Sequence, residues 1–194
     1  FFTPLYYLDV KILDIPGQSG YSLDLISRNY DTLINYMSVF NHGELAFPDL
    51  AMSPMGKIHF EEVKNIFVIL QILLPITAAD GIPWSIYLYI KKHERFFFKI
   101  AGIITLALPV FLGIWAAINF DSLFITFHKI AFRNDYWIFY PSLDPVINIL
   151  PEEFFMHALI LIVGIVIGMG ILFLVLGRKY SKKKIKRNSK KAIK

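Results

Sequence analysis

The sequence predicts a mainly α-helical, polytopic membrane protein: a helical bundle with a small extracellular cap. Its composition and its long apolar runs lead to this prediction. Apolar residues make up 56% of the 194 residues and aromatic residues 16%. A soluble domain of this size cannot bury that much apolar surface, and large exposed apolar areas indicate a membrane or a partner.

Three runs are long enough to cross a bilayer, which needs about 20 mostly apolar residues. They cover residues 65–90, 97–120 and 157–177, and the last contains no charged residue. The first run is irregular because it contains Pro75, Asp80 and Pro83. We expect Asp80 to cap the second half of a Pro-broken helix, with a functional intramembrane carboxylate as the alternative.

Basic residues set the orientation, because short cytoplasmic segments are rich in Lys and Arg. The segment 91–95, which joins the first two runs, and the tail 178–194 are both basic, and the tail has ten Lys or Arg and no acid. Both are expected in the cytoplasm, where the tail would touch anionic lipid. The chain would then start outside, so a fourth span is expected before Phe1.

Five segments follow from this topology. Residues 1–62 form an extracellular cap segment, 63–120 two transmembrane helices with the cytoplasmic loop 91–95, and 121–156 an extracellular aromatic-rich loop. Residues 157–177 form a further transmembrane helix and 178–194 a basic cytoplasmic tail. Within the outer segments, 1–15 is expected to be extended and 23–40 a helix capped by Ser22. Asp121 is expected to cap a short amphipathic helix that carries His128.

The outer loop 121–156 and its borders are the most informative part of the chain. Ten residues from Phe120 to Phe155, both included, are aromatic, and an interfacial aromatic belt alone would explain them. A belt does not require the polar residues among them: Asn134, Asp135, Glu152 and Glu153. Polar groups in an aromatic wall are typical of a small-molecule or lipid-headgroup site.

Two of the five histidines, His59 and His128, are each expected just outside a span on the same side of the membrane, with acids nearby. Such residues suit acid–base catalysis or, with a carboxylate, metal binding. The metal signal is weak, because the sequence after His59 lacks the two-His helical motif. Nucleophilic catalysis fits worst, since the chain has no Cys. His157, which opens the last span, is interpreted as interfacial.

Four stretches together resemble the bacterial lipoprotein intramolecular transacylase family, formerly an integral membrane family of unknown function. They are residues 29–36, 53–64, 127–137 and 151–155, and the stretch with His128, Asn134, Asp135 and Trp137 is the most specific. Glu62 stands where the family has Asp. The resemblance implies four spans and an extracellular cap in the bacterial plasma membrane.

The resemblance also implies a reaction. The substrate is a diacylglyceryl lipoprotein in the outer leaflet, and its sn-2 acyl chain moves to the α-amine of its own N-terminal Cys, giving lyso-form lipoprotein. No acyl-enzyme, cofactor or nucleic acid is needed, and membrane lipid is the surrounding partner. His59 and His128 are the expected base and acid, with the order open. The expected supporting residues are Asn134, Asp135 and Glu62 (oxyanion or orienting) and Tyr30, Tyr136, Trp137, Glu152, Phe154 and Phe155 (substrate-binding).

Two other functions stay open at the level of sequence. One is a metal-dependent membrane lipid or peptide hydrolase on the same scaffold. The other is a non-catalytic assembly or transport subunit, for which Asp80 would matter more than the outer histidines.

Overall fold

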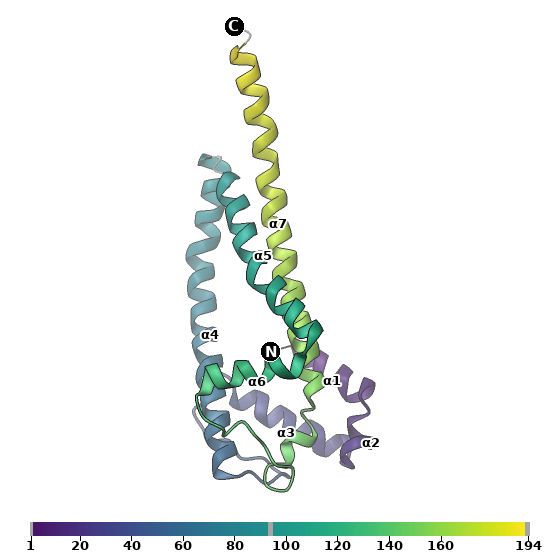
Figure 1. Ribbon diagram of the computed structural model, residues 1–194. Coiled ribbons are helices and arrows are strands. Elements are labelled where there is room, and N and C mark those ends of the chain that lie inside the picture. Colours follow the sequence, from purple (N-terminus) through teal and green to yellow (C-terminus); the bar gives the residue numbers. More distant parts are fainter. Residues whose placement is uncertain (1, 93–94, 193–194) are drawn as a thin grey trace. The chain divides into compact units, whose positions relative to one another are not determined.

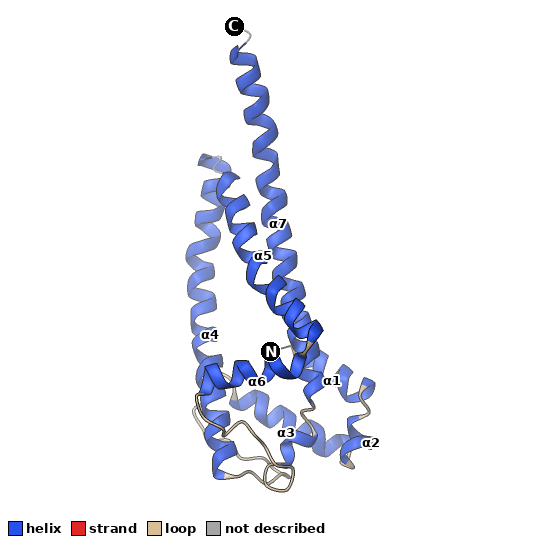
Figure 2. Ribbon diagram, in the orientation of Figure 1, coloured by secondary structure: helices blue, strands red, loops and turns tan. Residues whose placement is uncertain are grey.

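The computed structural model describes residues 2–92 and 95–192, and within these the side chains up to residue 91 and from 95 to 178. All regular secondary structure in this part of the chain is helical (Figures 1 and 2). The chain divides into two compact units. The first unit comprises Phe1–Pro75 and Asp121–Ala158, and the second comprises Ile76–Phe120 and Leu159–Lys194.

The start of the chain is helical, so the prediction of an extended stretch over 1–15 is wrong. Helix α1 covers Thr3–Ile12 and α2 covers Ile15–Ser19. Tyr6, Asp9 and Val10 are buried on one side of α1, which is the three-to-four-residue spacing of a helix face. Packing of this face outweighs the β-propensity of the aromatic and branched residues.

Helix α3, Leu23–Tyr36, confirms the predicted second helix and its cap. The Ser22 side chain accepts a hydrogen bond from the Leu25 backbone N–H at 3.2 Å. The helix ends at Tyr36, four residues before the predicted end. Its buried face joins the core of the first unit, which is formed by buried residues of α1, α3, α4 and the outer loop: Tyr6, Val10, Ile26, Tyr30, Leu33, Phe60, Val146 and Ile149.

Helix α4, Pro54–Tyr87, is capped by the Ser53 side chain, and a residue far along the chain holds Ser53 in place. The Ser53 backbone N–H and hydroxyl donate to the two carboxylate oxygens of Asp144, at 2.7 and 2.8 Å. The Gly56 N–H in turn donates to Ser53 Oγ at 2.9 Å. Asp144 is 3% exposed, and it precedes the short 3-10 helix η2, Pro145–Asn148. The outer loop therefore fixes where α4 starts.

The same helix continues through Pro75, Asp80 and Pro83, so the predicted Pro break, with Asp80 as its cap, is wrong. A short π-helical turn, Leu88–Lys92, follows it. Membrane helices tolerate proline because small backbone adjustments and neighbouring groups satisfy the freed carbonyl. At about 1.5 Å per residue, a helix of 34 residues is about 51 Å long, which exceeds the roughly 30 Å hydrocarbon core of a bilayer.

Three helices of the described chain are long and apolar enough to cross a membrane, as predicted: Pro54–Lys91, Arg95–Ile118 and Glu152–Arg178. The second is α5, and the third is the first part of α7, Glu152–Ala192. Two residues of the predicted basic loop, 93 and 94, and the chain start at residue 1 lie outside the described residues. The side chains of the tail beyond Arg178 do so as well.

Within the second unit, α5 and α7 approach closely at glycines. A Cβ on Gly102 would lie 2.8 Å from the Gly170 carbonyl oxygen, and one on Gly177 would lie 2.9 Å from the Lys99 backbone nitrogen. Glycine therefore allows backbone contact between these helices. Other glycines of α7, Gly164 and Gly168, have open space around them.

Two glycines of α4 give opposite predictions for substitution by alanine. A Cβ on Gly56 would lie 2.3 Å from Asp144 Oδ1, which cannot move away without releasing Ser53. We expect Gly56→Ala to lower the free energy of unfolding by about 1–3 kcal/mol. Gly81→Ala, with no atom within 4 Å of its Cβ, should be neutral or stabilising by up to about 1 kcal/mol. Thermal unfolding in detergent measures the stability of both variants. Equal changes in the unfolding temperature would contradict the proposed role of Asp144 at the start of α4.

Candidate functional site

The first unit brings His59 and His128 together, although they are far apart in sequence. His59 lies in the second turn of α4, and His128 lies on α6, Phe120–Phe132. Their ring centroids are 6.0 Å apart with an interplanar angle of 36°. His59 is buried, with 7% exposed, and His128 is half-buried. The predicted short helix that carries His128 is confirmed, but it begins at Phe120, so Asp121 lies in its first turn and is not its cap.

Aromatic side chains enclose both imidazoles. The rings of Phe132 and Phe139 lie 4.7 and 5.5 Å from that of His59. Those of Phe124 and Trp137 lie 4.0 and 4.8 Å from that of His128. Such a wall lowers the local polarity, and this strengthens every electrostatic interaction at the two rings.

A hydrogen bond fixes the tautomer of His128. Its Nδ1 lies 2.7 Å from the Phe124 carbonyl oxygen, one turn earlier on α6. A carbonyl can only accept, so Nδ1 carries the hydrogen. In the neutral ring, Nε2 is then left with a free lone pair. Burial lowers the pKa of His128 below its ordinary 6.5, and this effect outweighs the opposing one of the Phe124 hydrogen bond. The neutral, base-competent form is therefore favoured near pH 7.

The loop after α6 is held by Asn134. Its amide donates to Glu62 Oε1 at 2.8 Å and to the Phe132 carbonyl at 3.0 Å, and its Oδ1 accepts from the Tyr136 N–H. The Trp137 indole N–H donates to the Asn134 carbonyl at 2.8 Å. Both amide hydrogens of Asn134 are thus engaged. The geometry favours the orienting role expected for this residue over that of an oxyanion donor.

Two buried polar atoms of α4 have no hydrogen-bond partner among the described residues. They are His59 Nδ1 and Glu62 Oε2, which belong to residues three positions apart and so share one helix face. Buried polar atoms are nearly always satisfied, and exceptions concentrate where function requires them. Both atoms keep hydrogen-bonding capacity beside the imidazole pair.

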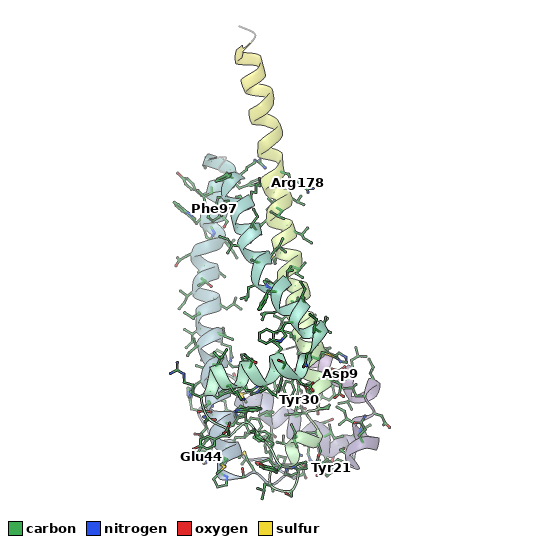
Figure 3. The ribbon with its side chains drawn as sticks, in the orientation of Figure 1. Asp9, Tyr21, Tyr30, Glu44, Phe97 and Arg178 are labelled. Carbon is green, nitrogen blue, oxygen red and sulfur yellow. The ribbon has the colours of Figure 1, made fainter. Side chains whose placement is uncertain are left out.

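The other predicted site residues lie in different surroundings. Asp135 is exposed, and its side chain makes no hydrogen bond or ion pair with a described residue. Tyr30, which Figure 3 labels, belongs to α3. It is 3% exposed and stacks on Tyr6 at 3.5 Å in the core, so it supports the cap. Glu152 is exposed. Phe154 and Phe155 contact other aromatic rings. The ring centroids of Phe154 and Tyr6 are 5.2 Å apart, and those of Phe155 and Phe124 are 5.7 Å apart.

Sequence reasoning missed two carboxylates of the first unit. Asp144 lies between two prolines in a loop, where an acid usually is a solvated turn residue. Asp9 was assigned to an extended stretch, and its contact with His157 could not be foreseen. The signal for Asp9 was its helical spacing from Tyr6, which places a charge on an otherwise apolar face.

Among residues 2–91 and 95–178, whose side chains the structure describes, no three His, Asp or Glu side chains are arranged to hold a metal ion.

Comparisons with known proteins show the family of this chain. The profile of the family described as "Lipoprotein intramolecular transacylase Lit" matches residues 1–155. The chain belongs to this family. The in meso structure of the membrane-integral lipoprotein intramolecular transacylase Lit from Bacillus cereus is 44% identical, with a TM-score of 0.87, over 94% of this chain and 85% of that one.

Two further Bacillus cereus Lit structures, each with one histidine substituted, are 43% identical. Their TM-scores are 0.76 and 0.74, and they cover 94% and 93% of this chain and 81% of theirs. An uncharacterised protein of Aquifex aeolicus is 28% identical over 146 residues, which is 74% of this chain. The chain spans 63% of the length of that relative.

The environment of His128 predicts its titration. Because burial lowers the pKa of His128, its proton should leave at a lower pH than that of an ordinary histidine, and the ring should be largely neutral at pH 6.5. ¹⁵N NMR of histidine-labelled protein in detergent measures this, with His128→Asn identifying the signal. The neutral ring should show hydrogen on Nδ1. A pKa at or above 6.5, or hydrogen on Nε2, would contradict the described environment.

Proposed function

We propose that this protein transfers the sn-2 acyl chain of a diacylglyceryl lipoprotein to the α-amine of the same molecule's N-terminal Cys. The product is lyso-form lipoprotein. The observation that carries the proposal is the pair of imidazoles enclosed by aromatic rings, 6.0 Å apart, in a chain of the lipoprotein transacylase family. An acyl transfer within one substrate needs an acid and a base but no protein nucleophile.

In the proposed reaction, the amine nitrogen attacks the ester carbonyl while His128 Nε2 accepts the amine proton. His59 takes that proton from His128, and the tetrahedral intermediate then collapses. The bond from the carbonyl carbon to the sn-2 oxygen breaks while His59 gives the proton to that oxygen, so both rings end neutral. An α-amine has a pKa of about 8 and must be neutral to attack, which is why a base is required.

Glu62 and Asn134 support this site by position. Asn134 holds Glu62 Oε1, while Glu62 Oε2 and His59 Nδ1 keep hydrogen-bonding capacity for the reacting groups. The aromatic residues, with Trp137 against His128, would surround the glyceryl thioether and exclude water. Holding the amine and the distant ester in one geometry can supply about 7–11 kcal/mol toward the barrier.

We further propose that the site faces the outer leaflet of the bacterial plasma membrane and that the basic tail is cytoplasmic. The positions of the basic segments support this orientation. His59 lies at the start of the first span and His128 between the second and third spans, whereas the basic segments follow the first and third spans. The lipoprotein substrate would then enter from the surrounding lipid with its peptide outside.

The two histidines should be essential. We expect His59→Ala and His128→Ala each to lower the transfer rate at least about 100-fold, because general acid–base catalysis contributes about 10²–10⁴. The exposed His42 supplies the control, and His42→Ala should retain full rate. Purified protein is incubated with a diacylated lipopeptide, and fragmentation mass spectrometry locates the acyl chain. Full transfer by either site variant would refute the assignment.

Treatment with a chelator distinguishes the proposed transacylase from a metal-dependent hydrolase. We expect transfer to be unchanged after prolonged treatment with a strong chelator, and the acyl chain to appear on the Cys nitrogen with no free fatty acid. A chelator-sensitive release of fatty acid would instead favour a metal-dependent hydrolase. The same mass spectra give both readings, since migration leaves the total mass of the lipopeptide unchanged and hydrolysis lowers it.

A further inference from the structure

Asp9 is a fully buried carboxylate that the proposed reaction does not use. It is 1% exposed, and its Oδ1 accepts a hydrogen bond from His157 Nδ1 at 2.8 Å. Oδ2 has no partner among the described residues. The bond joins α1 to the second turn of α7, across 148 positions of sequence.

Stability alone is a poor explanation for such a pair. Removing a carboxylate from water costs more than one hydrogen bond returns, and apolar replacements of buried ionic pairs are often neutral or stabilising. Asp9 also sits beside the buried, apolar Val10 in the core of the first unit. The Asp9–His157 hydrogen bond therefore serves to fix the position of α7 against α1 more than to raise the free energy of unfolding.

The bond belongs to a matched pair of helix faces. Tyr6 lies one turn before Asp9 on α1, and Phe154 lies one turn before His157 on α7. The rings of Tyr6 and Phe154 meet edge to face at 5.2 Å and 82°. The Tyr6 hydroxyl also donates to the Ile149 carbonyl at 2.8 Å. Together these contacts fix the first turns of α7 against α1.

From α7 the contacts lead to the proposed base. Phe155, next to Phe154, packs on Phe124 of α6 at 5.7 Å. The Phe124 ring lies 4.0 Å from that of His128, and its carbonyl accepts the His128 Nδ1 hydrogen at 2.7 Å. A shift of the first turn of α7 would therefore move the Phe124 ring, and with it the His128 ring that packs on it and donates Nδ1–H to the Phe124 carbonyl.

We propose that Asp9 and His157 are positioning residues for His128. Their hydrogen bond fixes the first turns of α7 and thereby, through Phe155 and Phe124, the Nδ1-protonated tautomer of His128. The kinetic consequence rests on the proposed function, whereas the consequence for the tautomer does not.

The test uses the double variant Asp9→Leu, His157→Phe, which removes the bond and leaves no buried charge. We expect it to unfold at or above the temperature of the original protein. Its kcat for lipopeptide transfer should fall at least about tenfold with KM within about twofold, because small misplacements of reacting groups are costly. ¹⁵N NMR should show His128 as a mixture of both neutral tautomers.

Two single variants complete the design. His157→Asn keeps an N–H donor near the place of Nδ1 and should restore most of kcat and the single tautomer. Tyr7→Phe removes a 2.7 Å hydrogen bond from α1 to Asp31 on α3, which does not lead to α7, and should leave both readings unchanged.

An unchanged His128 tautomer in the double variant would overturn the proposal, as would a tautomer change of equal size in Tyr7→Phe. If the original protein transfers no acyl chain, the proposed function fails. The NMR readings still decide whether the pair positions His128.

Discussion

The start of α4 is the constraint on which the rest of the site depends. Asp144, buried in the outer loop, accepts both donors of Ser53 and so determines where the helix begins. His59 and Glu62 follow within three turns on that helix, and the loop returns to Glu62 through Asn134. The outer loop is thus fastened to α4 before and after His59. These two attachments therefore hold His59 in its orientation toward α6.

Burial among aromatic rings then gives the histidines their chemistry. The wall of Phe124, Phe132, Phe139 and Trp137 favours the neutral imidazole, since a low-polarity environment disfavours the charged form. For His128, the Phe124 carbonyl selects the tautomer with a free Nε2 lone pair. A reaction that only moves protons and an acyl chain within one substrate needs little more than this arrangement and a place to hold the lipid.

Much of this architecture was predictable from sequence because membrane helices and interfacial histidines leave strong local signals. The three spans, the Ser22 cap and the helix that carries His128 all follow from apolar run length, capping chemistry and periodicity. The helical start of the chain was mispredicted because tertiary packing outweighed local propensity. The unbroken α4 was mispredicted because membrane helices tolerate proline. Asp144, Phe139 and the Asp9–His157 bond depend on contacts between distant segments, for which a single sequence has no signal.

A crossover experiment tests the central claim most directly. Two diacylated lipopeptides are mixed with the protein, one with isotope-labelled acyl chains and the other with a labelled peptide. Transfer within one substrate molecule predicts N-acylated products in which each peptide keeps its own chains, with no doubly labelled species. Doubly labelled product, formed by an acyl chain that passed from one lipopeptide to the other, would contradict a direct transfer and require an acyl-enzyme or an exchange between substrates.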